Sequence, residues 1–428
     1  MATTLERAAQ PNLALGGLNW AYVLVGAADA TLLPYVPLYL FQRGLGAEQI
    51  GAILAAAAGC SLLAGMVWAF LADRSVRPER AVVGASVAAA GVVLLFPLAQ
   101  GAFPVALVTA ALFLARAPFT LLDPITLQRL REASRTRYAR IRLRMSAGWA
   151  LCAVISGGVY QVFGLRMMPF LYAPMVAVFG LWVWHALRPA PKQPVQAGVS
   201  APGTRRLPSL PLAMVGFLVA CFLLGASSAG AQNFVALRIN ILGGGALLIG
   251  AAAAFQALTE IPTMGTTHLL TKRMSYRSLF AIGCGVYVVV FLAWGLVSDP
   301  VTLALLRLAT GVAFALTYVA AVLIADQLTP AHMRATGQAL VKAVMFGLAP
   351  VAGSFGGGLI YGEVGPRAMF FAASIVVAAA GFIAMIGIPD ARRRASPELA
   401  PQSQEMVDSL STGLTGQQTT PAAARSRL

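Results

Sequence analysis

Charged residues are scarce in this sequence, and acidic residues are the scarcest of them. Only 11% of the 428 residues are charged, with 15 Asp and Glu against 31 Lys and Arg, whereas 58% are hydrophobic. A soluble domain of this length carries roughly 25% charged residues. A water-soluble fold is excluded, because no packing would hide so much apolar surface. We therefore expect an integral membrane protein.

Residues that carry metal, redox or hydrolytic chemistry are also few. The sequence has three histidines and no H-E-x-x-H, G-x-S-x-G or C-x-x-C pattern. Its cysteines all lie in apolar segments, as small buried residues do; they are Cys60, Cys152, Cys221 and Cys284. We expect no metal site, no cofactor and no enzymatic activity.

Twelve apolar segments have the length of about 20 residues that spans a bilayer. They lie near 13–41, 48–71, 81–99, 104–124, 145–163, 169–187, 210–232, 247–270, 279–297, 301–325, 337–361 and 367–388. This pattern predicts an all-α membrane protein with twelve transmembrane helices.

Positive charge lies mainly between these segments and gives the orientation. Seven arginines fall in the stretch 121–152 alone. With both termini in the cytoplasm, 24 of the 31 basic residues lie on the inner side. Four lie in outer loops: Arg43, Arg166, Arg238 and Arg367. This bias predicts a cytoplasmic-membrane protein with both ends inside. We expect the lipid bilayer as a partner, no nucleic-acid partner, and function as a monomer.

The chain divides into two halves of six predicted helices. Residues 188–208 are proline-rich and basic and predict a cytoplasmic linker between the halves at 1–187 and 209–389. The tail, 390–428, has the polar composition of a disordered segment. The stretch 35–52 aligns without gaps on 234–251, with both Gly-x-Gly pairs in register. Parallel repeats of this kind build the major facilitator transporters, whose substrate site lies between the halves.

Several motifs resemble one branch of the major facilitator superfamily, that of the lactose–proton symporter, nucleoside–proton symporters and phenylpropionate-type permeases. These motifs are PYVPLYLFQRGLGAEQIG (34–51), LADR (71–74), LLDPITL (121–127), YARIRL (138–143), GWALCA (148–153), LTEIP (258–262), GVAFALTYVAA (311–321) and GGLIYGEVG (357–365). The resemblance implies a transporter that works by alternating access.

The resemblance also implies roles for particular residues. Arg142 matches an arginine that holds sugar hydroxyls, Trp149 a tryptophan that stacks on the sugar ring, and Asp123 an acid that pairs with the arginine. Asp73 and Arg74 match a gating loop. The family's histidines on the tenth helix are absent here, replaced by Thr310 and Tyr318, and Arg144 replaces an aromatic residue. Lactose is therefore not the expected substrate.

Further charges lie inside predicted helices, where a charge needs a partner, water or a function. Arg116 and Arg307 need counter-charges, and Asp29 and Glu260 are available. Glu260 lies near mid-bilayer and is the leading candidate for proton coupling, with Asp29 second. Asp29 and the three arginines Arg116, Arg142 and Arg307 are candidate substrate ligands, with Trp149 as a stacking platform.

We therefore expect a secondary active transporter that couples a small organic solute to protons. An anion, an aromatic carboxylate, a nucleoside and a sugar all remain open, with a tilt towards an anion. The alternative of the same fold is a drug–proton antiporter that works in efflux. An intramembrane enzyme or a non-transporting sensor is the alternative from another class.

Overall fold

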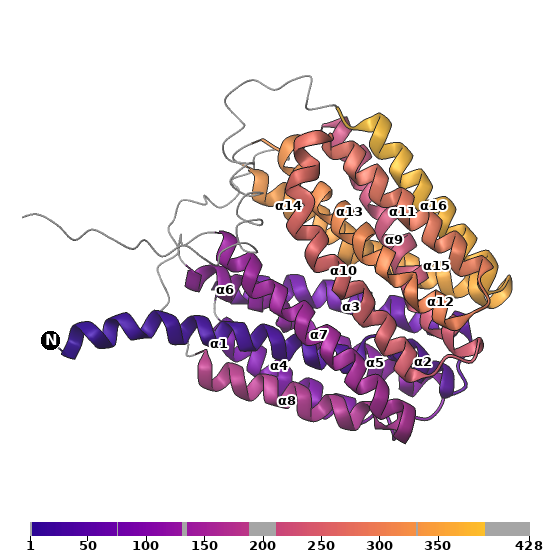
Figure 1. The fold of residues 1–428 in the computed structure, drawn as a ribbon. Coiled ribbons are helices and arrows are strands. Elements are labelled where there is room, and N and C mark those ends of the chain that lie inside the picture. Colours follow the sequence, from indigo (N-terminus) through magenta and orange to yellow (C-terminus); the bar gives the residue numbers. More distant parts are fainter. Residues whose placement is uncertain (1, 75, 131–134, 188–210, 331–332, 390–428) are drawn as a thin grey trace, which may run out of the picture.

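The computed structural model describes residues 2–74, 76–130, 135–187, 211–330 and 333–389, which form helices and no strand (Figure 1). The first half contains α1 (Ala2–Leu32), α2 (Val36–Gln42), α3 (Ala47–Arg74), α4 (Pro78–Val93), α5 (Ala102–Arg116), η1 (Ala117–Leu121), α6 (Leu122–Leu130), α7 (Arg135–Phe163), η2 (Leu165–Met167) and α8 (Met168–Ala186). The second contains α9 (Leu212–Ile241), α10 (Ala246–Arg273), α11 (Tyr276–Leu296), α12 (Pro300–Leu305), α13 (Arg307–Leu328), α14 (Arg334–Ala343), the π-helical turn η4 (Val344–Leu348), α15 (Ala349–Glu363) and α16 (Pro366–Gly387).

Eleven of the described helical segments are long and apolar enough to cross a membrane, and each overlaps a predicted span. The remaining predicted span, 81–99, corresponds to α4, whose 16 residues extend about 24 Å at 1.5 Å per residue. α4 packs against α8 and α5, and it completes the six membrane-spanning helices of the first half. The predicted twelve-helix fold is confirmed. The predicted linker and tail lie outside the described residues.

The two halves repeat the same packing scheme. In the first half, α1 packs against α7 and α8, and α4 packs against α8 and α5. In the second half, α9 packs against α15 and α16, and α11 packs against α16 and α13. α3 with α5 and α10 with α13 form a further matching pair. This correspondence is the three-dimensional form of the sequence repeat.

One residue that was predicted to lie in an outer loop lies in a helix instead. Arg238, placed by sequence in an outer loop, is buried in the last turn of α9. The first half breaks at the equivalent point, because Pro34 separates α1 from α2 and Pro37 opens α2. α9 has no proline in this region and continues to Ile241. The first half therefore has a helix break at a point where the second half has a continuous helix.

The halves meet through two helix pairs, α7 with α10 and α3 with α15. Contact is closest at the end that carries residues 43–46 and 242–245, which we name the closed end. There a Cβ added to Gly51 would lie 2.6 Å from the carbonyl oxygen of Ser354, and one on Gly250 would overlap the carbonyl of Ala153. Towards the opposite end, which we name the open end, the halves diverge (Figure 1).

Candidate substrate and coupling site

Helix interruptions hold three of the predicted site residues. Asp29 lies one turn before the break between α1 and α2, and its carbonyl accepts a hydrogen bond from the amide of Leu33. Arg116 is the last residue of α5, before the 3₁₀ turn η1. Arg307 is the first residue of α13, after the turn at Leu306. Interrupted helices are tolerated in membranes where the backbone is buried or lines a cavity, and transporter sites recur there.

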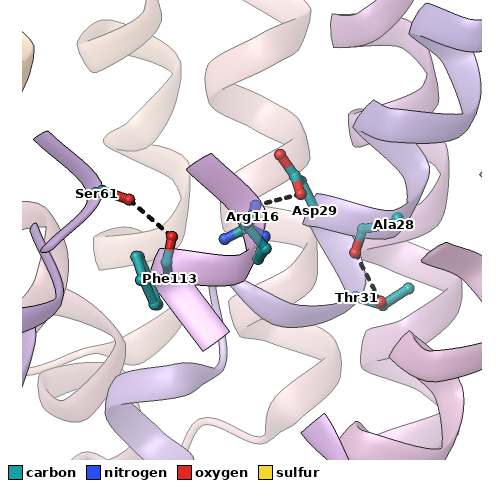
Figure 2. Close-up of polar contacts among 6 residues, drawn as sticks. All are labelled: Ala28, Asp29, Thr31, Ser61, Phe113 and Arg116. Atoms are coloured by element: carbon teal, nitrogen blue, oxygen red, sulfur yellow. Dashed lines mark hydrogen bonds and ion pairs between the residues drawn. The ribbon is translucent and has the colours of Figure 1, made fainter. Parts of the chain in front are cut away.

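Asp29 and Arg116 form an ion pair between α1 and α5 (Figure 2). Both side chains are only 10% exposed. The guanidinium also faces two aromatic rings, with its central carbon 5.5 Å from the ring centre of Phe113 and 6.0 Å from that of Tyr172. The counter-charge expected for Arg116 is therefore present, and the pair is neutralised within the first half.

Arg307 has a different environment. Its Nη2 donates to the side-chain oxygen of Gln256 on α10, at 2.6 Å, and to that of Gln232 on α9, at 3.3 Å. Within the described part of the chain, no carboxylate lies at ion-pair distance from Arg307, and its buried Nε has no partner. Glu260, the counter-charge that the sequence offered, does not bond to it. Two neutral amides surround this charge instead.

Asp123 and Arg142 are in contact, as their positions in the sequence predicted. Nη1 of Arg142 on α7 donates to Oδ2 of Asp123 on α6 at 2.8 Å. The other carboxylate oxygen accepts a 2.6 Å hydrogen bond from the hydroxyl of Tyr22 on α1. The Arg142 and Asp123 side chains are 47% and 34% exposed, so this cluster is open to solvent. It joins three helices of the first half towards the open end.

Glu260 lies on α10, opposite Arg142 on α7. These helices run in opposite directions, with Gly250 against Ala153, so Glu260 and Arg142 fall at the same level of the interface. Arg142 acts electrostatically on the Glu260 carboxylate, which makes no hydrogen bond or ion pair with any residue that the structure describes. The structure thus brings a carboxylate of one half beside a cation of the other.

Trp149 lies closer to the closed end on α7. It is partly buried and packs against three small residues at the junction of the halves: Ala30, Ala153 and Ala253. Its indole is therefore placed where α1, α7 and α10 converge, between the tight contacts of the closed end and the Glu260 level.

The predicted gating residues lie at the open end. Arg74 is the last residue of α3, with its guanidinium carbon 4.1 Å from the centre of the Phe70 ring. The side chain of Asp73 lies outside the described residues. The region that can be described contains no group of three His, Cys, Asp or Glu side chains suited to a metal ion.

Gln232, Gln256 and Tyr22 are site residues that were not predicted from the sequence. Each is a polar side chain inside an apolar segment, and that contrast is the signal that could have revealed them. Neither an amide nor a hydroxyl carries a charge that needs a counter-charge in the membrane, so the sequence gives little reason to look for its partner.

The repeated six-helix halves and the broken helices within them define a transporter of the major facilitator type. The chain belongs to the MFS_1 like family, whose model matches residues 16–372.

Two curated relatives illustrate the range of this class. The chain is 26% identical to a maltose permease of Geobacillus stearothermophilus over 391 residues, covering 88% of this chain and 95% of the permease. It is 21% identical to the multi-drug resistance efflux pump PmrA of Streptococcus pneumoniae over 378 residues, covering 83% of this chain and 91% of the pump.

Solved structures share the fold at lower identity. The nucleoside transporter NupG superposes with a TM-score of 0.74 at 16% identity, covering 88% of this chain and 99% of that one. A POT family transporter in complex with a thioalcohol-conjugated peptide gives a TM-score of 0.71, also at 16% identity, covering 87% of this chain and 95% of that one.

Proposed function

We propose that the protein moves a small organic solute across the cytoplasmic membrane by alternating access, in symport with protons. The observation that carries this proposal is the register of α7 against α10, which sets Glu260 across the interface from Arg142, with no hydrogen bond or ion pair to the Glu260 carboxylate in the described part of the chain. When the cationic neighbour of a carboxylate belongs to the other half, the electrostatic interaction between the two groups changes whenever the halves move.

The coupling follows from two opposing effects on Glu260. Burial disfavours its charged form, and a nearby guanidinium favours that form. Rocking of the halves, 1–187 against 209–389, changes the separation of Arg142 and Glu260, so the carboxylate binds its proton more tightly in one state than in the other. Arg142 takes the role that the sequence had suggested for Arg307.

The test is uphill transport by protein reconstituted in vesicles with a pH gradient. Glu260→Gln should fold and exchange solute across the membrane, yet lose accumulation driven by the gradient. Glu363→Gln, which changes an exposed carboxylate at the end of α15, is the matched control and should accumulate solute as the wild type does. Undiminished pH-driven accumulation by Glu260→Gln would refute the coupling role.

Efflux of a drug in exchange for protons is the second candidate, favoured by the likeness to the PmrA pump. The same vesicles separate the two directions. An antiporter expels its substrate when protons enter, whereas a symporter accumulates it.

We also propose that both termini are cytoplasmic, supported by the bias of basic residues. Single cysteines at Gln100 and Ser298, both exposed at the closed end, should then react with an impermeant reagent from outside. A cysteine at Arg80, exposed at the other end, should not. The opposite labelling pattern would invert the topology.

A further inference from the structure

We propose that the transported solute is an organic anion and that Arg307 binds its negative group. This inference rests on the proposed transport function and names its substrate class. An arginine keeps its positive charge inside proteins, and a charge within a membrane span is costly unless it is paired or functional. Arg307 is partly buried among helices, with two neutral amide oxygens as its acceptors.

The other two candidate arginines are already matched with acids. Arg116 is paired with Asp29, and Arg142 bonds to Asp123 and lies near Glu260. Arg307 alone of these three has no carboxylate partner in the described region. Its Nε, like that of Arg116, is buried without an acceptor. A guanidinium with unused donors is suited to a carboxylate, which it binds through two parallel hydrogen bonds.

The surface beside Arg307 is suited to an apolar body. Phe314 lies seven residues after Arg307 and Tyr318 four residues further on, which places all three on one face of α13. The two rings are stacked, with centres 5.6 Å apart, and Phe346 from η4 lies 5.9 Å from Tyr318. Seven residues of helix separate the charge from the first ring by about 10 Å.

An anion at Arg307 would also link solute binding to protonation. Gln256, which accepts a hydrogen bond from Arg307, lies one helical turn before Glu260 on α10, so the two sites share one neighbourhood. A bound anion and an ionised Glu260 repel each other, which favours joint binding of the anion and a proton. The groups that face this neighbourhood are Arg142 on α7, Gln232 on α9, Gln256 on α10, Tyr287 on α11 and Arg307 on α13.

The experiment is thermal unfolding of the purified full-length protein with matched acids and amides. The probes are acetate, butyrate, benzoate and 4-phenylbutyrate, each compared with its uncharged amide. A ligand that binds the folded state raises the unfolding midpoint. The wild type should respond to one or more acids and not to the corresponding amides, with the ring-bearing acids most effective.

Arg307→Gln should weaken the apparent affinity for the responding acid by about tenfold or more, because it removes the charge-assisted hydrogen bonds. Arg307→Lys should retain part of the response, and Arg166→Gln, an exposed control, all of it. Amides that stabilise as well as the acids, an absence of any acid response, or an unchanged response in Arg307→Gln would overturn the proposal. If a neutral solute is accumulated in a pH gradient, the transport proposal stands and the anion proposal falls.

Discussion

The two halves of the molecule treat a membrane-embedded arginine in opposite ways. In the first half, Arg116 is held by the carboxylate of Asp29. In the second half, Arg307 occupies a comparable helix interruption but is held by the amides of Gln232 and Gln256. Related packing therefore supports two electrostatic designs. The first pair is internally neutral. The second arginine has no carboxylate partner in the described chain, and we propose that a ligand supplies one.

The strongest expected effect of this difference is on stability. Asp29→Asn or Arg116→Gln alone leaves one buried charge without its partner and should cost about 3–5 kcal/mol of unfolding free energy. The double variant Asp29→Asn/Arg116→Gln should recover much of that loss. The unfolding free energies of the wild type and the three variants, measured in one detergent, form a double-mutant cycle. If the losses of the two single variants simply add in the double variant, the pair does not act as a unit.

The next effect concerns the contact between the halves at the closed end. Gly51→Ala adds a Cβ that would lie 2.6 Å from the Ser354 carbonyl oxygen, so the closed end should lose about 1–3 kcal/mol of contact energy. A disulfide between cysteines at Glu48 and Gly362, which face each other across this contact, reports closure. Its yield should fall in Gly51→Ala.

Gly65→Ala on the same helix is the matched control, because a Cβ there meets nothing within 4 Å. Equal disulfide yields in the two variants would show that the Gly51 contact does not hold the halves together.

The smallest effect is expected at the Asp123 cluster. The pair with Arg142 is partly exposed, so a double-mutant cycle of Asp123→Ala and Arg142→Ala should give a coupling of about 0.5–1 kcal/mol. Tyr22→Phe should cost about 1 kcal/mol by removing one hydrogen bond. A coupling of zero would mean that the two charges act independently.

The fold was predictable from the sequence because hydropathy marks each span directly. Arg238 was misplaced because the seventh predicted span ended at residue 232, whereas α9 continues to Ile241. The contact of Asp123 with Arg142 was predictable, since the family resemblance places both on a known pair.

The environment of Glu260 and Arg307 was not predictable in the same way. Charge alone suggested that they pair, but the partners of Arg307 are neutral amides on two other helices. The approach of Arg142 to Glu260 depends on how the halves meet, and no local pattern encodes that register.

The most direct test of the contrast between the halves compares Arg116→Gln and Arg307→Gln by thermal unfolding, without added organic anions. Arg116→Gln leaves the Asp29 carboxylate without its cationic partner and should strongly lower the thermal unfolding midpoint. Arg307→Gln removes a charge that has no acid partner in the described chain, so its midpoint should equal or exceed that of the wild type. A loss in Arg307→Gln as large as that in Arg116→Gln would contradict the account.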